Sequence, residues 1–135
     1  GEAKPFAAQL TEAGQKHVVF GGYRRDLNRI HRGCYAGVIA STGWDSFTVS
    51  SIEMQASGLP LLVSNLDGLR ETIVQRETGK VFDTGSAKAL KGILVDLLDD
   101  PVERNIMSNS ARLRIENSFT IENQKLCLKR LIDPR

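Results

Sequence analysis

The chain has 135 residues, 41% of them hydrophobic and 25% charged, which is the composition of a single soluble domain with a sizeable core. Its 18 basic and 16 acidic residues are evenly spread, so the charge excludes the concentrated basic surface that nucleic-acid binding requires. No apolar run reaches the roughly 18 residues that span a bilayer, and we expect neither a membrane span nor a signal peptide. The two cysteines, Cys34 and Cys127, lie far apart and predict free thiols in a cytosolic protein.

The first part of the chain predicts two helices and two strands in alternation. Residues 5–15 have a helical composition, and residues 17–20 form an apolar run that suits a strand and is too short for a helix. Asp26 is the expected N-cap of a helix that reaches about Cys34, and residues 36–40 predict the second strand. The buried face expected for the first helix has these members: Phe6, Leu10 and Ala13.

The second part continues this alternation and ends in helices. A short helix is expected after residue 48, closed by Gly58, and residues 61–64 follow it as a strand that is apolar on both faces. Residues 69–75 predict a further short helix, and residues 81–82 a minimal fourth strand after a turn at Gly79. This alternation indicates an α/β fold: a Rossmann-like parallel sheet with helices on both faces, incomplete at its N-terminus, with a helical C-terminal tail.

The tail predicts helices that each begin at a recognisable start signal. Ser86 precedes the first, Pro101 opens the second, and Thr120 caps the third with Glu122 in its first turn. The buried face expected for the first of them comprises Leu90, Ile93, Leu94, Leu97 and Leu98. The buried face expected for the second comprises Val102, Ile106 and Leu113.

Sheets of this kind bind ligands at the carboxyl ends of their strands, so the candidate loops are residues 21–25, 41–47 and 64–68. The second of these loops runs into a helix for which Ser46 or Thr48 is the expected N-cap. The amides of Phe47 to Ser50 would then point out of the helix, where an anion such as phosphate is favoured.

Two carboxylates lie near this helix start. Asp45 precedes the helix, and Glu53 lies about one turn into it, where its oxygens could accept hydrogen bonds from hydroxyl groups. The core-facing stripe expected for this helix consists of Val49, Ile52 and Ala56, which leaves Glu53 on another side. An anion site between two carboxylates suits a ligand with both phosphates and neutral hydroxyls, such as a nucleotide sugar.

A simpler interpretation competes with this one. A glutamate in a short helix is usually solvated, an aspartate before a helix is usually a cap, and helix starts follow strands in every fold of this class. Spacing alone favours the simpler interpretation. His17 and His31 have no partners at ligand spacing, and Arg24 and Arg25 are expected to be solvated. Trp44 either packs under the loop or lines a sugar site.

Residues 45–60 resemble the E-x7-E motif of retaining glycosyltransferases of the GT-B fold, in particular glycosyltransferase family 4. Asp45 and Glu53 are acids eight positions apart, Ser-Phe follows the first of them, and Gly-Leu-Pro follows the helix. Residues 18–23 are similar to the family's strand and glycine turn, and residues 67–81 to its later loop, helix and turn. The resemblance covers nearly the whole chain and corresponds to the C-terminal, donor-binding half of such an enzyme.

The resemblance implies a role for the two acids, for the helix amides and for the loop before Asp26. Asp45, at the first acid position, is the expected catalytic residue and contacts hydroxyls of the donor sugar, while Glu53 holds the ribose. The helix amides are expected to meet the diphosphate, and the loop before Asp26 to lie near the base. The implied nucleotide-sugar-binding residues are Glu53, Phe47, Thr48, Val49, Ser50, Tyr23 and Arg24. The implied chemistry is metal-independent sugar transfer with retention, using a nucleotide-diphosphate sugar and no cofactor.

The chain departs from the family pattern at several positions. Asp45 is one methylene shorter than the usual glutamate, Thr48 stands where glycine is common, and Tyr35 stands where an acidic residue is common. The family's donor domain begins with another strand and a loop whose basic pair clamps the diphosphate, and nothing in this chain matches them.

The sequence thus predicts that residues 1–135 form one nucleotide-sugar-binding domain, a fragment of a longer enzyme whose partner is an N-terminal acceptor-binding domain. That enzyme would build a polysaccharide or glycolipid in the cytoplasm, with peripheral association at the inner face of the membrane left open, and the fragment alone would be inactive. The alternative is a non-catalytic α/β module that binds a nucleotide or a protein. A receiver-like domain fits the architecture but requires an acidic cluster at the strand ends, which this chain lacks.

Overall fold

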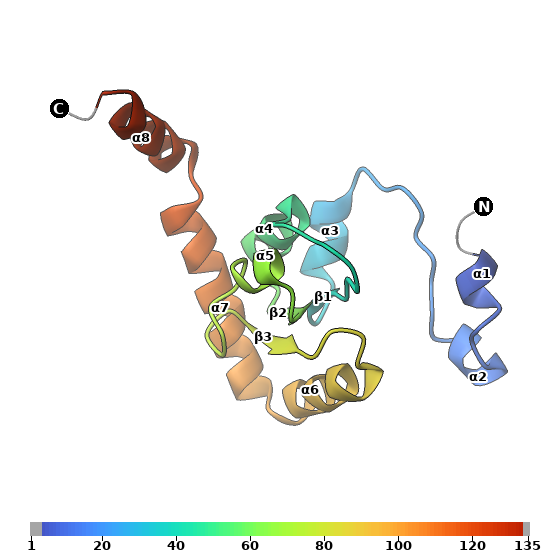
Figure 1. Ribbon diagram of the computed structural model, residues 1–135. Coiled ribbons are helices and arrows are strands. Elements are labelled where there is room, and N and C mark those ends of the chain that lie inside the picture. The colour runs from blue at the N-terminus through green and yellow to red at the C-terminus, as the bar shows by residue number, and fades with distance from the viewer. Residues whose placement is uncertain (1–3, 134–135) are drawn as a thin grey trace.

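The computed structural model describes residues 4–133 and shows helices arranged around a small parallel sheet (Figure 1). Its strands lie in the order β1-β2-β3 and span Gly37–Ile39, Leu61–Ser64 and Gly79–Phe82. Both strand pairs are parallel, and Leu61 lies opposite Gly37 on one side and Gly79 on the other. The predicted α/β fold with a parallel sheet and a helical tail is therefore confirmed.

The middle strand, β2, carries the centre of the core. All of its residues are buried, because β1 and β3 cover its edges and helices cover it from the faces. The core cluster comprises Leu61, Val63, Leu69 and Ile73. Gly79 is the first residue of β3 rather than the preceding turn, and a Cβ there would overlap the carbonyl oxygen of Leu61.

The central helices are α3 (Leu27–Arg32), α4 (Val49–Ala56), α5 (Asp67–Arg70), α6 (Ala87–Asp99), α7 (Pro101–Ser118) and α8 (Ile121–Ile132). Helix α4 packs on β1, β2 and α7, whereas α6 packs on β3 and α7. In the view of Figure 1, α4 and α5 lie above the strands and α6 below them. None of the helices within residues 4–133 is long and apolar enough to cross a membrane.

Helix α4 ends as the sequence predicts but presents a different face to the core. Gly58 has a φ of +79°, donates its amide to the carbonyl of Gln55 at 2.8 Å, and so closes the helix. The expected stripe of Val49, Ile52 and Ala56 is wrong: Val49 is 72% exposed, and the buried residues are Ser51 and Gln55. Both polar side chains have hydrogen-bond partners: Gln55 donates to the carbonyl of Thr72, after α5, and Ser51 donates to the carbonyl of Thr48 at the start of α4.

The N-terminal segment differs most from expectation. Residues 5–15 form two short helices, α1 (Lys4–Ala7) and α2 (Glu12–Gln15), because the Thr11 hydroxyl accepts the Gly14 amide at 3.1 Å and starts a new helix. The expected buried face of the first helix is wrong, since Phe6 is 62% exposed. Figure 1 shows both helices set apart from the sheet.

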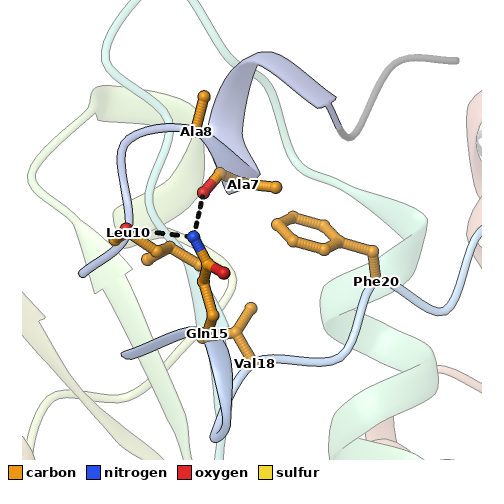
Figure 2. Close-up of a pocket in the computed structure, with 6 residues that line it drawn as sticks. All are labelled: Ala7, Ala8, Leu10, Gln15, Val18 and Phe20. Atoms are coloured by element: carbon orange, nitrogen blue, oxygen red, sulfur yellow. Dashed lines mark hydrogen bonds between the residues drawn. The ribbon is translucent and has the colours of Figure 1, made fainter. Parts of the chain in front are cut away.

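The strand predicted over residues 17–20 is not formed, because no described strand lies beside it, and Val19 is 91% exposed. Figure 2 shows Val18 and Phe20 of this segment beside α1 and α2. There the side-chain amide of Gln15, in α2, donates to the carbonyls of Ala7 and Leu10 at 3.4 and 3.3 Å. Phe20 closes one side of a hollow of about 360 Å³ there. None of the predicted site residues lines that hollow.

The tail helices begin where the sequence places them. The hydroxyls of Ser86 and Thr120 accept amides in the first turns of α6 and α8, and Pro101 opens α7. The face expected for α6 is largely confirmed, since Leu97 is fully buried and Leu90, Ile93 and Leu94 are half-buried, but Leu98 is 61% exposed. The face expected for α7 is wrong, since Val102, Ile106 and Leu113 are exposed. Helix α7 instead buries Met107, Ala111 and Ile115, because this is the side on which α4 and α6 pack.

Replacing Gly79 by alanine is expected to destabilise the fold by about 3 kcal/mol or more, because backbone atoms of β2 cannot move away from the new methyl group. Gly92 is the matched control, since it lies inside α6 with open space around it. Its change to alanine should raise the free energy of unfolding by about 0.5–1 kcal/mol. Denaturant titrations of both variants measure the difference, and equal stabilities would contradict this account of the sheet.

Candidate functional site

The candidate site lies at the carboxyl edge of the sheet, where the loop after β1 meets the end of β2. Ser64, the last residue of β2, donates its hydroxyl to the carbonyl of Ser41 at 2.7 Å. The Ser41 hydroxyl donates to one carboxylate oxygen of Asp45 at 2.5 Å, and the Ser46 amide donates to the other at 2.8 Å. The Asp45 carboxylate is therefore held in one orientation by groups that the sheet positions.

The start of α5 packs against the backbone of this loop, so two of the three predicted loops come together. A Cβ on Gly68 would lie 2.6 Å from the Cα of Ser46 and 2.8 Å from the carbonyl oxygen of Asp45, and only glycine allows this approach. A hollow of about 340 Å³ results, lined by Trp44, Asp45, Ser46, Phe47, Leu66, Asp67 and Gly68.

This hollow combines two carboxylates with aromatic rings, and no basic residue of the described chain lines it. Trp44 is 93% exposed, so it does not pack under the loop. Carboxylates accept hydrogen bonds from hydroxyl groups and repel anions, whereas aromatic rings suit the apolar faces of sugars. The hollow around Asp45 thus favours a neutral polyhydroxyl group over a phosphate.

The N-terminus of α4 lies beside this hollow and leaves backbone donors free. Thr48 occupies the N-cap position, but neither its side chain nor that of Ser46 makes the predicted capping bond. The Thr48 hydroxyl is buried without a hydrogen-bond partner among residues 4–133. The backbone carbonyl of Thr48 accepts a hydrogen bond from the Ser51 hydroxyl at 2.6 Å. The amides of Val49 and Ser50 donate no hydrogen bond within the described chain, so they remain available to an anion.

Glu53 lines a second hollow, of about 370 Å³, between α3 and α4. The residues around it are Arg25, Leu27, Asn28, His31, Glu53 and Ala56. The carboxylate of Glu53 makes no hydrogen bond or ion pair with any described residue, and the same holds for the side chains of Arg25 and His31. Asp45 and Glu53 therefore lie in separate hollows, one before the start of α4 and one between α3 and α4, and the free amides lie between the two residues along the chain.

Sequence reasoning missed Arg25, Asn28 and His31 as neighbours of Glu53. Asn28 and His31 lie one turn apart on α3, and Asn28 accepts a hydrogen bond from the Ser57 hydroxyl at the end of α4, at 3.4 Å. The helical spacing could have placed these residues on one face. Nothing in the sequence indicated that this face would meet α4.

Tyr23 and Arg24 lie apart from Glu53's hollow. Tyr23 is 90% exposed, and Arg24 forms an ion pair with Asp26 at 2.6 Å, in place of the helix cap expected from Asp26. The hydrogen bond from Arg24 lowers the pKa of the Asp26 carboxyl below its usual value and raises the pKa of Arg24. In this structure Arg25, rather than Arg24, faces Glu53, and contacts of Tyr23 and Arg24 with a base stay predictions.

Helix α7 braces α4 through a polar contact in the core. The side-chain amide of Gln55 donates to the carbonyl of Thr72 at 2.8 Å, and Arg114 donates to the same carbonyl at 2.7 Å. Arg114 also donates to the carbonyl of Glu71 at 3.2 Å, and burial lowers its pKa below the ordinary value. The Arg114 guanidinium lies 4.9 Å from the ring centre of Phe119. This bracing reaches the face of α4 opposite to Glu53.

Residues 4–133 contain no group of three or more histidine, cysteine, aspartate or glutamate side chains that could hold a metal ion. Cys34 and Cys127 are free and exposed. Metal-independent chemistry stays a prediction, because the amides and carboxylates described above can bind a nucleotide sugar with or without an added cation.

The fold and this edge geometry define an α/β domain whose candidate site lies at the carboxyl edge of a parallel sheet. Residues 1–114 match the family described as Glycosyl transferases group 1, and the chain belongs to this family of GT-B glycosyltransferases.

Two curated relatives illustrate this family. The chain is 30% identical over 107 residues to the Escherichia coli UDP-Gal:alpha-D-GlcNAc-diphosphoundecaprenol alpha-1,3-galactosyltransferase, covering 79% of the chain and 27% of that protein. It is 33% identical over 76 residues to the capsular polysaccharide biosynthesis glycosyltransferase CapM of Staphylococcus aureus, covering 56% of the chain and 20% of that protein. The chain thus spans about a quarter of the length of such relatives.

Solved structures show the same fold. HepE from Anabaena, in complex with UDP-glucose, matches 94% of the chain and 36% of its own length, with a TM-score of 0.86 and 20% identity. The C-terminal domain of LpcC, a group 1 glycosyl transferase from Francisella tularensis, matches 89% of the chain and 62% of that domain, with a TM-score of 0.71 and 23% identity.

Replacing Gly68 by alanine should displace the loop that holds Asp45, because the new methyl group meets backbone atoms of Asp45 and Ser46. The expected loss of stability is about 1–3 kcal/mol, together with shifted amide resonances at Ser41 and Ser46. Gly43 lies in the same loop, with nothing within 4 Å of the place that a methyl group would take, so its change to alanine is the control. Unshifted loop resonances in the Gly68 variant would refute the close approach.

Proposed function

We propose that this chain is the nucleotide-sugar-binding half of a retaining glycosyltransferase that transfers a sugar to a polysaccharide or glycolipid acceptor. One observation carries the proposal: Asp45 lines a hollow just before α4, Glu53 lines another between α3 and α4, and the free amides of Val49 and Ser50 lie between the two carboxylates along the chain. A nucleotide sugar has the matching order of chemical groups, since a diphosphate joins its sugar to its nucleoside.

This order assigns one end of the donor to each hollow. The hollow at Asp45, rich in carboxylates and aromatic rings, would hold the sugar, and Asp45 would accept hydrogen bonds from its hydroxyls. Glu53 would accept hydrogen bonds from the ribose hydroxyls, with Arg25 and His31 on the opposite wall of the same hollow. The printed names of the relatives agree with such donors: the E. coli enzyme uses UDP-Gal, and the HepE structure holds UDP-glucose.

In the proposed reaction the bond between the anomeric carbon and the leaving phosphate oxygen breaks, and a bond from that carbon to an acceptor hydroxyl oxygen forms on the same face. The products are the glycosylated acceptor, a nucleoside diphosphate and the acceptor's proton. The amides at the start of α4 would stabilise the charge that develops on the leaving diphosphate. A separate domain would hold the acceptor. That domain would also supply the basic side chains that the hollow at Asp45 lacks.

The second candidate is a binding module without catalysis. It is favoured by the absence of a basic side chain of the described residues around the hollow at Asp45, because a leaving diphosphate needs more than two amides for stabilisation. Replacing Asp45 by asparagine separates the two candidates in the longest native polypeptide that contains this chain. The transferase proposal expects a loss of turnover of about 100-fold with nucleotide affinity retained. Absence of any sugar transfer by the wild-type polypeptide, across donors and lipid or glycan acceptors, would favour the module.

Replacing Glu53 by alanine should weaken binding of UDP and UDP-sugars by about 10- to 100-fold, because hydrogen bonds to a charged group contribute roughly 1.5–3 kcal/mol. Stability should stay nearly unchanged, since this exposed carboxylate has no partner in the described chain. Calorimetric titration and thermal unfolding measure the two effects.

The matched control for this variant is Glu12→Ala, an exposed glutamate in α2 that lines neither hollow. It should leave both affinity and stability as they are. The role of Glu53 would be refuted by a large loss of stability, or by full retention of affinity for UDP, GDP and ADP in a polypeptide that binds one of them.

A further inference from the structure

We infer that Phe119, held by Arg114, is a positioning residue for the donor site, and this inference rests on the function proposed above. The family match ends at residue 114, so Phe119 lies outside the matched segment. It nevertheless reaches the start of α4, because α7 packs along that helix: Ser108 donates to the carbonyl of Gly58 just after α4, and Arg114 donates to the side chain of Gln55. The ring of Phe119 stacks on the ring of Phe47, with the centroids 5.7 Å apart and an interplanar angle of 28°.

Phe47 is the link between this stack and the chemistry. It lies two residues after Asp45 and directly before the N-cap residue Thr48, and it lines the hollow of Asp45. Its ring therefore fixes the backbone between the carboxylate and the free amides. A stacked aromatic pair contributes about 0.5–1.5 kcal/mol beyond its buried area, enough to favour one loop orientation by up to about tenfold.

Arg114 also contacts the ring of Phe119 and is itself anchored independently of that ring. Its guanidinium donates to the carbonyls of Thr72 and Glu71, and its position over Phe119 adds a cation–π contact at 4.9 Å. The stack is thus connected to the core through backbone carbonyls that cannot move without disturbing the segment after α5. Phe119 thus contacts both this fixed cation and the ring of Phe47.

The exposure of the two rings indicates that they position the loop more than they stabilise the whole fold. Phe119 is 40% exposed and Phe47 is 39% exposed, so the pair buries far less apolar surface than a core contact. Loss of the ring should therefore change the loop more than the overall free energy of unfolding. A residue that only stabilises the core would instead change the free energy of unfolding more than the loop.

The inference is tested with Phe119→Leu, which removes the aromatic ring, and Phe119→Tyr, which keeps it. Phe6→Leu is the matched control, since it makes the same change at another exposed phenylalanine, on α1. Amide hydrogen exchange of residues 44–50 is measured without ligand, and affinity for UDP and GDP by calorimetry, in the longest native polypeptide that contains the chain.

Phe119→Leu should raise exchange in residues 44–50 by up to about tenfold and weaken nucleotide binding by a similar factor. Phe119→Tyr and Phe6→Leu should leave both unchanged. Unchanged exchange, or unchanged affinity despite faster exchange, would overturn the inference while the proposed function stands. Absence of nucleotide binding by the wild-type polypeptide would overturn the proposed function, and the inference with it.

Discussion

The orientation of α4 depends on one buried polar contact. Gln55 is fully buried, and its amide donates to the carbonyl of Thr72, which also accepts a hydrogen bond from Arg114. Leaving that amide without a partner would cost about 1–3 kcal/mol, so α4 must turn this side toward Thr72, in the segment after α5, and toward Arg114 of α7. Glu53 lies two positions earlier, roughly on the opposite side of the helix, and is therefore directed toward α3. A structural hydrogen bond of Gln55 thus decides which way Glu53, the proposed ribose-binding residue, points.

A second constraint fixes the position of Asp45: backbone segments approach one another closely at two glycines. Gly68 allows the start of α5 to touch the Asp45 loop, and Gly79 allows β3 to lie against β2. Ser64 then ties the end of β2 to the same loop through the carbonyl of Ser41. The loop of Asp45 is therefore held by contacts to the sheet and to α5 that differ from the contacts directing Glu53. The two hollows are thus built by separate contacts that meet at the N-terminus of α4.

The sequence predicts those features that depend on short-range signals. The strand at residues 61–64, the glycine that closes α4 and the start of each tail helix were all correctly placed, because apolar runs, Gly58 and capping residues such as Thr120 act locally. The buried face of α6 is largely as predicted, but those of α4 and α7 are wrong, because the face that a helix buries depends on where other helices pack, as Val49 and Ser51 of α4 show. The strand expected at residues 17–20 failed for the same reason: a strand needs a neighbour, and periodicity cannot supply one.

The same limit applies within the candidate site. Asp45 and Glu53 stand out by their spacing and by a family resemblance, whereas Arg25 and His31 become visible only when α3 is seen against α4. The two hollows of the site also differ in their charge. The hollow at Asp45 carries two carboxylates and no cation of the described chain, while the hollow at Glu53 balances one carboxylate with Arg25. A diphosphate between them would be drawn to the amides of α4 and away from Asp45 and Asp67, which orients the donor with its sugar, not its phosphates, over the acidic hollow.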